Sequence, residues 1–304
     1  MSKFLCIILL ALTPVLSIAN QSDTIIIKKH LKEITKTEKA RNYKNLESLN
    51  AAASYIYKEF TQFADSTYYQ KYDVEGKEYK NVIAVFGSNN KRTIVVGAHY
   101  DVCGDQEGAD DNASGTVGLL ELARMLKGEQ LKYRIELVAY TLEEPPFFRS
   151  EFMGSYIHAK SLKESNRDVF GMVCLEMIGY FDSNKKTQDY PIGLLSWFYG
   201  NTGDYITVVN KFGRGKFSSI FSSKFKKLAT IKTKMFNGPK SLQGIDFSDH
   251  LNYWHFGFSA LMITDTAFYR NKNYHEKTDQ MHTLDITKMA KVIDSVYFTL
   301  TRLN

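Results

Sequence analysis

The segment from residue 96 to residue 115 constrains the fold of this chain more than any other stretch. A short apolar run, typical of a buried strand, ends at His99 and Asp101. A polar loop follows and delivers Asp110 and Asp111 directly before an apolar stretch that we expect to be a helix. Because a strand end and a helix start are rigid and expose side chains at the edge of a sheet, metal sites of α/β proteins are built in this way. The segment therefore predicts a metal site, with further ligands at the ends of later strands.

The rest of the chain alternates between apolar runs with strand character and amphipathic stretches. Strands are expected at 67–74 and 78–86 (a hairpin), 93–98, 134–140, 171–177, 229–234 and 259–263; helices are expected within 24–64 and at 114–126, 155–165, 205–224 and 286–303. Residues 180–201 predict a long loop near the site. This alternation favours an α/β fold with a mostly parallel, mixed central sheet and helices on both faces. One domain over residues 20–304 is the simplest organisation.

The N-terminal residues have the pattern of a secretory signal peptide. Lys3 precedes an apolar run that ends at Ala19, with Ser17 and Ala19 spaced as a cleavage site requires. A membrane anchor is the alternative, but the run is shorter than the roughly 20 residues that a spanning helix needs. We therefore expect residues 1–19 to be removed. The mature protein is expected to be secreted or periplasmic, without stable membrane insertion.

The charge of the chain does not indicate a nucleic-acid partner. The formal net charge of +6 is mild and spread along the sequence. The densest basic stretch, 211–234, interleaves its charges with Phe, Ile and Leu, and no nucleic-acid motif accompanies it.

Cysteine usage leaves two interpretations open. Cys6 would be removed with the signal peptide, so Cys103 and Cys174 remain in the mature chain. An even number in an exported protein allows one disulfide. Two buried free thiols are the equally weighted alternative.

Four separate segments carry residues that can bind a metal. They are His99 with Asp111, the pair Glu143 and Glu144, Glu176, and His275. Histidine and carboxylate ligands without thiolates suit Zn²⁺ in a catalytic rather than a structural site. Two histidines and three carboxylates are too many for one open tetrahedral ion, but they serve two ions if one carboxylate bridges them.

These segments together resemble a known enzyme family. The five motifs are His99-x-Asp101, the run Gly108 to Gly115, Glu143-Glu144, the run Glu176 to Gly179, and Tyr274-His275-x-x-x-Asp279. In this order and at about this spacing they resemble the co-catalytic di-zinc aminopeptidases of the bacterial leucyl aminopeptidase and aminopeptidase Y type. Glutaminyl cyclases share that fold. The resemblance runs from about residue 80 to the end of the chain.

The resemblance implies a di-zinc site with defined ligands. They would be His99, Asp111, Glu144, Glu176 and His275. Asp111 would bridge the two ions, Glu144 and Glu176 would each complete one of them, and His275 would close the second. Asp101 would orient the ring of His99 from behind.

The resemblance also implies how peptides would be hydrolysed at their N-terminus. Glu143 would be the general base that takes a proton from the water between the metals and passes it to the leaving amine. Tyr274 would donate its hydroxyl to the developing oxyanion. Asp249 and His250 fall where relatives place residues that line the substrate pocket.

Two other functions compete with this interpretation. A mono-zinc glutaminyl cyclase is one, because Asp249-His250 resembles the acid–histidine pair of those enzymes. The run 111–115 is that of peptidases, however, and Tyr274 stands where cyclases tend to carry Trp. A binding domain on an inactive peptidase fold is the other alternative. An inactive domain would lack some of the family's metal ligands, and this sequence carries all of them.

The sequence departs from the family pattern at two places. Residues 145–152 are inserted after Glu144, where relatives turn quickly, and this bears on the shape of the substrate pocket. Glu176 stands where many relatives have Asp, which would alter the metal separation slightly.

Overall fold

The structure, a computed structural model, describes residues 21–303. Its helices are α1 (Thr24–Thr35), α2 (Leu46–Thr61), α3 (Gly115–Leu126), α4 (Gly154–Glu164), α5 (Leu195–Tyr199), α6 (Gly215–Leu228), α7 (His250–His255) and α8 (Ile286–Thr301). Its strands are β1 (Ser66–Val74), β2 (Lys77–Phe86), β3 (Thr93–His99), β4 (Arg134–Tyr140), β5 (Val169–Glu176), β6 (Ile206–Lys211), β7 (Thr233–Gly238) and β8 (Ala260–Thr264). Short π- and 3₁₀-helical turns at Ala109–Ser114, Ala267–Tyr269 and Met281–Thr283 complete the elements.

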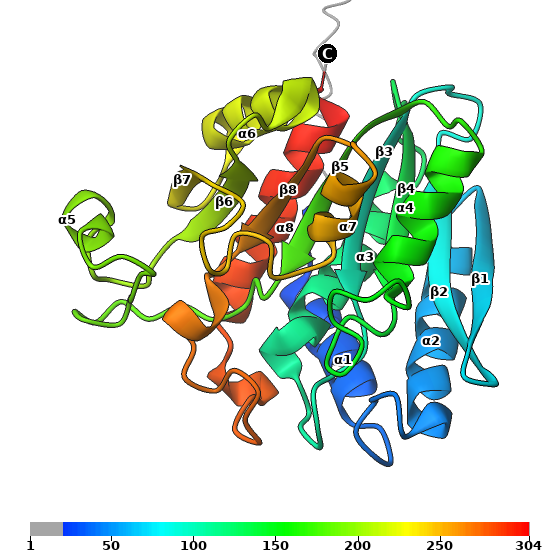
Figure 1. The fold of residues 1–304 in the computed structure, drawn as a ribbon, viewed down its shortest axis with the longest axis horizontal. Coiled ribbons are helices and arrows are strands. Elements are labelled where there is room, and N and C mark those ends of the chain that lie inside the picture. The colour runs from blue at the N-terminus through cyan, green and yellow to red at the C-terminus, as the bar shows by residue number, and fades with distance from the viewer. Residues whose placement is uncertain (1–20, 304) are drawn as a thin grey trace, which may run out of the picture.

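The strands of the described residues form one mixed sheet in the order β1-β2-β4-β3-β5-β8-β6-β7 (Figure 1). Strands β4, β3, β5 and β8 are parallel neighbours, as are β6 and β7. The β1–β2 hairpin adds antiparallel strands at one edge, and β6 pairs antiparallel with β8. The predicted α/β fold with a mostly parallel central sheet is confirmed.

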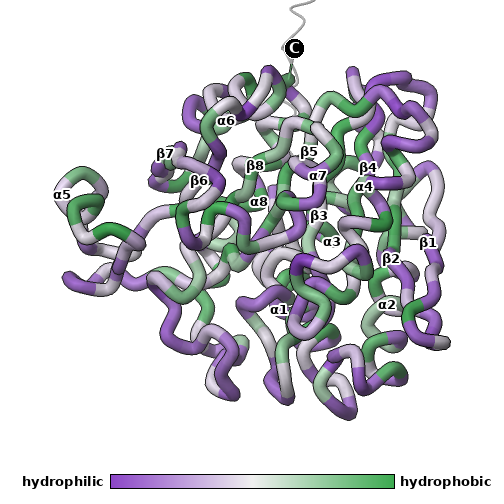
Figure 2. Tube along the Cα trace, viewed as in Figure 1, coloured by the Kyte–Doolittle hydropathy of each residue, from purple (hydrophilic) through white to green (hydrophobic). Residues whose placement is uncertain are grey.

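Helices cover both faces of this sheet. Ile94 and Val96 of β3 belong to the core cluster under α1, α2, α3, α6 and α8, whereas Val95 belongs to the cluster under α4 and α7. Side chains of a strand point alternately to the two faces, so a central strand buried on both sides must be apolar throughout. Figure 2 shows this as hydrophobic colour on the central strands and hydrophilic colour on the outer loops.

One part of the predicted element pattern is wrong. The helix expected over 205–224 is instead strand β6 followed by α6, and the strand expected at 229–234 is β7, which begins at Thr233. The run from Ile206 to Val209 is short, β-branched and fully buried, which favours a strand over a helix. The loop at 180–201 contains the short helix α5.

The described residues include no helix that is long and apolar enough to cross a membrane. The predicted signal peptide at residues 1–19 lies outside them.

Candidate metal centre

The carboxyl ends of β4, β3 and β5 lie next to one another, and they bring together residues that are far apart in the sequence. His99 ends β3 and Glu176 ends β5. The Nε2 atom of His99 lies 3.4 Å from Glu176 Oε2 and 3.5 Å from Asp111 Oδ1. All three side chains are buried. Their ligand atoms lie within 4.8 Å of one another, close enough to hold one ion.

A second group of ligand atoms adjoins the first through Asp111. His275 Nε2 lies 3.2 Å from Asp111 Oδ2 and 3.2 Å from Glu144 Oε2. The two carboxylate oxygens of Asp111 therefore face different histidines, Oδ1 toward His99 and Oδ2 toward His275. This is the arrangement that a carboxylate bridging two ions requires.

The electrostatics of the cluster fit bound cations. Burial, with the neighbouring carboxylates, raises the pKa of Glu143 well above its usual value, despite the opposing effect of His99. Burial and Asp111 raise the pKa of Glu144 to about 7. Asp111 Oδ2 and Glu144 Oε1 are buried without a hydrogen-bond donor. A buried carboxylate needs a hydrogen-bond donor, a charge partner or a metal. The two unpaired oxygens are therefore suited to bind zinc, the metal that histidine and carboxylate ligands favour.

Asp101 supports the centre from behind. His99 Nδ1 donates to the backbone carbonyl of Asp101 at 3.2 Å, and the Oδ1 atom of the Asp101 carboxylate lies near the same nitrogen at 3.6 Å. A carbonyl or carboxylate in this position orients a ligand histidine. The two carboxylate oxygens of Asp101 also accept hydrogen bonds of 3.2 Å from the backbone N–H groups of Glu143 and Glu144. The sequence interpretation expected the carboxylate to act on His99 and missed its hydrogen bonds to the two glutamates, because the turn after β4 is placed only by the fold.

The loop that carries Asp111 is held by groups to which the sequence interpretation assigned no role. Asp279 accepts hydrogen bonds from the backbone N–H groups of Asp110 and Asp111, at 2.9 and 3.0 Å. The side-chain oxygen of Asn112 accepts from Gly115 N, and a Cβ at position 115 would lie only 2.4 Å from it. Glycine at position 115 is thus a packing requirement. Asp279 stands in the sequence as the last residue of the fifth motif.

Glu143 and Tyr274 face the cavity above these ligands. The cavity has a volume of about 550 Å³. Its lining comprises Asp111, Glu143, Glu144, Pro145, Phe148, Glu176, Phe247, Ala267, Phe268, Tyr274 and His275. The ring of Tyr274 stacks on His275 with centroids 3.9 Å apart. Burial and the nearby carboxylates raise the pKa of Tyr274, so its hydroxyl keeps the proton that an oxyanion would need.

The inserted segment after Glu144 forms part of the mouth. Phe148 and Phe247 pack edge to face with centroids 5.9 Å apart. Arg149 lies over both rings and pairs with Asp246 at 2.7 Å. The insertion therefore contributes an aromatic wall to the cavity.

Asp249 and His250, which the resemblance places in the substrate pocket, line neither the metal cavity nor the aromatic cavity described in the next paragraph. Both are fully buried. Burial raises the pKa of Asp249 to about 7, and its charge in turn raises the pKa of Glu143. The ring of His250 donates from Nε2 to the Ile245 carbonyl at 2.7 Å.

A second, aromatic cavity of about 710 Å³ opens beside the metal centre. It shares Glu176, Phe247, Ala267 and Phe268 with the first cavity, and its other rings are Tyr190, Tyr199, Tyr205, Phe236 and Tyr269. Strand pairing places Glu176, Thr264, Thr207 and Lys234 in one row across β5, β8, β6 and β7. The sequence interpretation missed this cavity because β6 was expected to be helical.

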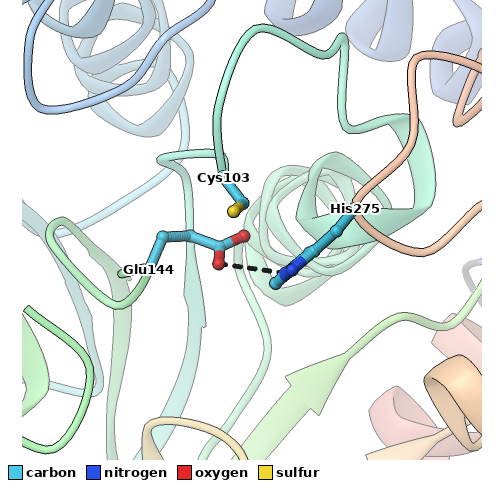
Figure 3. A group of neighbouring side chains, drawn as sticks. All are labelled: Cys103, Glu144 and His275. Carbon is cyan, nitrogen blue, oxygen red and sulfur yellow. Dashed lines mark ion pairs between the residues drawn. The ribbon is translucent and has the colours of Figure 1, made fainter. Parts of the chain in front are cut away.

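The structure contains no disulfide between Cys103 and Cys174, so both are free thiols, but only one of them is buried as that alternative expected. Cys174 is buried and its sulfur lies 3.0 Å from Ser248 Oγ, whose hydroxyl donates to Glu176 at 2.6 Å. Cys103 is only partly buried and lies beside Glu144 and His275 (Figure 3).

Comparison with known proteins identifies the family. Residues 81–299 match the sequence pattern of the family described as peptidase family M28. The chain belongs to this family of metallopeptidases, which confirms the resemblance carried by the five motifs.

Two relatives show how far the similarity extends. A protein of Escherichia coli (strain K12), described as uncharacterized protein YfbL, is 43% identical over 283 residues, which cover 89% of this chain and 85% of that protein. A probable leucine aminopeptidase of Arthroderma otae is 27% identical over 69% of this chain. The match spans 52% of that enzyme, so the chain covers about half the length of this relative.

Solved structures share the fold. The Legionella pneumophila LapA aminopeptidase superposes with a TM-score of 0.71 at 20% identity, over 92% of this chain and 72% of that one. A glutaminyl cyclase of Bacteroides thetaiotaomicron superposes with a TM-score of 0.72 at 17% identity, over 93% of this chain and 99% of that one. The same sheet therefore serves two chemistries, and only the site can distinguish them.

Proposed function

We propose that the chain is an exported zinc aminopeptidase that removes the N-terminal residue from peptides. The observation that carries the proposal is the position of Asp111, whose two oxygens face two separate histidine-containing ligand groups. His99, Asp111 and Glu176 would hold one zinc ion, and Asp111, Glu144 and His275 the other. Zinc bound there would supply a Lewis acid and a bound water of lowered pKa.

The remaining residues would perform the proton transfers. Glu143 would accept the proton of the attacking water and pass it to the nitrogen of the leaving amine as the C–N bond breaks. Its place beside the ligands supports this role: its Oε2 atom lies 3.8 Å from His99 Nε2, and it lines the cavity. Tyr274 would donate its hydroxyl to the developing oxyanion. Asp101 would keep His99 and both glutamates in place.

Substrates would enter past the aromatic mouth, with the N-terminal side chain directed into the neighbouring aromatic cavity. We assign Asp249 and His250 to the support of this substrate side. Asp249 acts on the charge of Glu143, and His250 holds the segment of Ile245, which lines the aromatic cavity.

A panel of substrates tests the proposal. The zinc-loaded protein should hydrolyse aminoacyl anilides and leave N-blocked analogues intact, because a blocked amine cannot occupy an aminopeptidase site. Activity should be lost on chelation, and metal analysis of the active protein should find close to two zinc ions per chain. Equal hydrolysis of blocked and free anilides would contradict an aminopeptidase.

One observation favours a second candidate, a glutaminyl-peptide cyclotransferase. Asp249 is a buried acid next to the proposed base, as the acid–histidine pair of that reaction class requires. The same panel therefore includes an N-terminal glutaminyl peptide. Cyclisation of that peptide, with full activity at one bound ion, would favour the cyclase.

Export is tested separately. The mature chain recovered from the periplasm or the medium should begin at Asn20. A full-length chain that still carries Met1 in that fraction would contradict cleavage.

A further inference from the structure

Cys103 lies at the metal centre, where the ligand types predicted from the sequence included no sulfur. It follows His99 by four residues, in the loop between β3 and the turn that carries Asp111. Its sulfur, a carboxylate oxygen of Glu144 and a ring nitrogen of His275 lie within 4.8 Å of one another. Figure 3 shows the Cys103 sulfur facing the Glu144 carboxylate, and a dashed line joins the same carboxylate to His275.

Among the described residues Cys103 has no disulfide partner, and its thiol interacts with the ring of His275. Cys174, the only other cysteine of the described residues, is buried elsewhere and contacts Ser248. Glu144 is 4% exposed, and its Oε1 atom has no hydrogen-bond donor, while Oε2 faces His275. A buried carboxylate oxygen without a donor needs a cation.

We infer that Cys103 is a sulfur ligand of the ion on the His275 side, in addition to Asp111, Glu144 and His275. Zn–S and Zn–N bonds of about 2.3 and 2.1 Å at a tetrahedral ion place the two ligand atoms about 3.6 Å apart. The three groups, whose ligand atoms lie within 4.8 Å of one another, therefore need to approach by at most about 1.2 Å. Binding releases the thiol proton to solvent and forms the metal–sulfur bond. This inference rests on the metal centre proposed above.

A sulfur ligand would make the two ions chemically different. The ion held by His99 and Glu176 would have only nitrogen and oxygen ligands. The ion on the His275 side would favour metals that accept thiolates, such as Zn²⁺ and Co²⁺, over Mg²⁺ or Mn²⁺. We expect a chelator to remove the ion on the His275 side more slowly than it would if that ion had only nitrogen and oxygen ligands.

Cobalt provides a direct test, because a cobalt–thiolate bond absorbs in the near ultraviolet whether or not the enzyme turns over. The metal-free protein is titrated with Co²⁺ in the wild-type form and in the Cys103→Ser, Cys103→Ala and Cys174→Ser variants. The charge-transfer band should appear in the wild type and in Cys174→Ser, and it should be absent from both Cys103 variants. Cys103→Ser should bind the second ion roughly tenfold more weakly or worse, since even an outer-sphere partner contributes about 10–100-fold.

Alkylation gives an independent readout. Iodoacetamide should modify Cys103 in the metal-free protein, and Zn²⁺ but not Mg²⁺ should protect it. Two cobalt ions bound to the wild type without the band, or equal alkylation with and without zinc, would refute the sulfur ligand and leave the metal centre standing. A protein that binds no cobalt would refute both.

Discussion

The two cavities that meet at Glu176 are built in different ways. The metal cavity is lined by carboxylates and a histidine from loops and turns that follow the strands, and its backbone is fixed by N–H groups that donate to the carboxylates of Asp101 and Asp279. The aromatic cavity is walled by rings from loops and from β7, and Thr207 and Val209 of β6 line it as well; α5 lies apart from the sheet (Figure 1). Under the proposed function, the first cavity holds the reacting groups and the second accepts the N-terminal side chain of the substrate. Catalysis and selectivity should therefore respond to different substitutions.

The largest effect is expected from Glu143→Gln. Glutamine has nearly the same shape but cannot accept a proton, so the variant removes the base and keeps the ligand geometry. We expect kcat to fall roughly 10²–10⁴-fold, with little change in KM or zinc content. Steady-state kinetics on an aminoacyl anilide and metal analysis measure both.

Glu144→Gln is the matched control. It changes a ligand in place of the base, so it should lose zinc from the His275 side. If Glu143→Gln lost zinc while Glu144→Gln retained it, the two roles would be reversed. Near-normal activity in both variants would place the active site elsewhere.

Selectivity should respond to Thr207→Phe in the floor of the aromatic cavity. Thr207 is buried on β6, in the strand-pairing row between Thr264 and Lys234. A ring there would fill the space and lower kcat/KM for a large N-terminal residue by up to about 200-fold. The value for an alanyl substrate should change little.

Thr233→Phe is the control for this experiment. Thr233 is half-buried on β7 and lines neither cavity, because side chains alternate between the faces of a strand. Selectivity should be unchanged. A uniform loss for all substrates in Thr207→Phe would mean that the aromatic cavity does not hold the substrate side chain.

The same difference explains what the sequence could predict. The residues of the proposed metal centre stand in short motifs, at a strand end for His99 and Glu176 and in the turn before a helix for Asp111. Local pattern and order along the chain therefore predict them. The aromatic cavity has no such signal, since its rings are ordinary core residues until the sheet brings them together. The error at 205–224 hid β6, and with it the floor of that cavity. The role of Cys103 was equally invisible, because only tertiary packing places it beside His275.

Asp101→Asn should weaken the metal centre more mildly than the loss of a ligand. The amide keeps the size of the side chain but loses the negative charge that faces His99 and can accept through only one oxygen. We expect zinc affinity to fall about 10–100-fold, with kcat largely restored at saturating zinc. Competition with a chelating dye measures the affinity. An unchanged affinity would show that Asp101 only positions backbone.

The smallest expected effect concerns His250, which supports the wall of the aromatic cavity. Burial lowers its pKa from 6.5 to about 4, so the folded protein keeps the ring neutral where the unfolded chain takes up a proton. The free energy of unfolding should therefore fall as the pH drops from 6.5 to 4, by at most about 3 kcal/mol at 1.36 kcal/mol per pKa unit.

In His250→Gln this part of the fall should disappear, because the amide can still donate to the Ile245 carbonyl and does not titrate. Urea unfolding across this range measures it, with the exposed His255→Gln as control. Identical pH dependence in wild type and His250→Gln would mean that the ring already accepts a proton in the folded state.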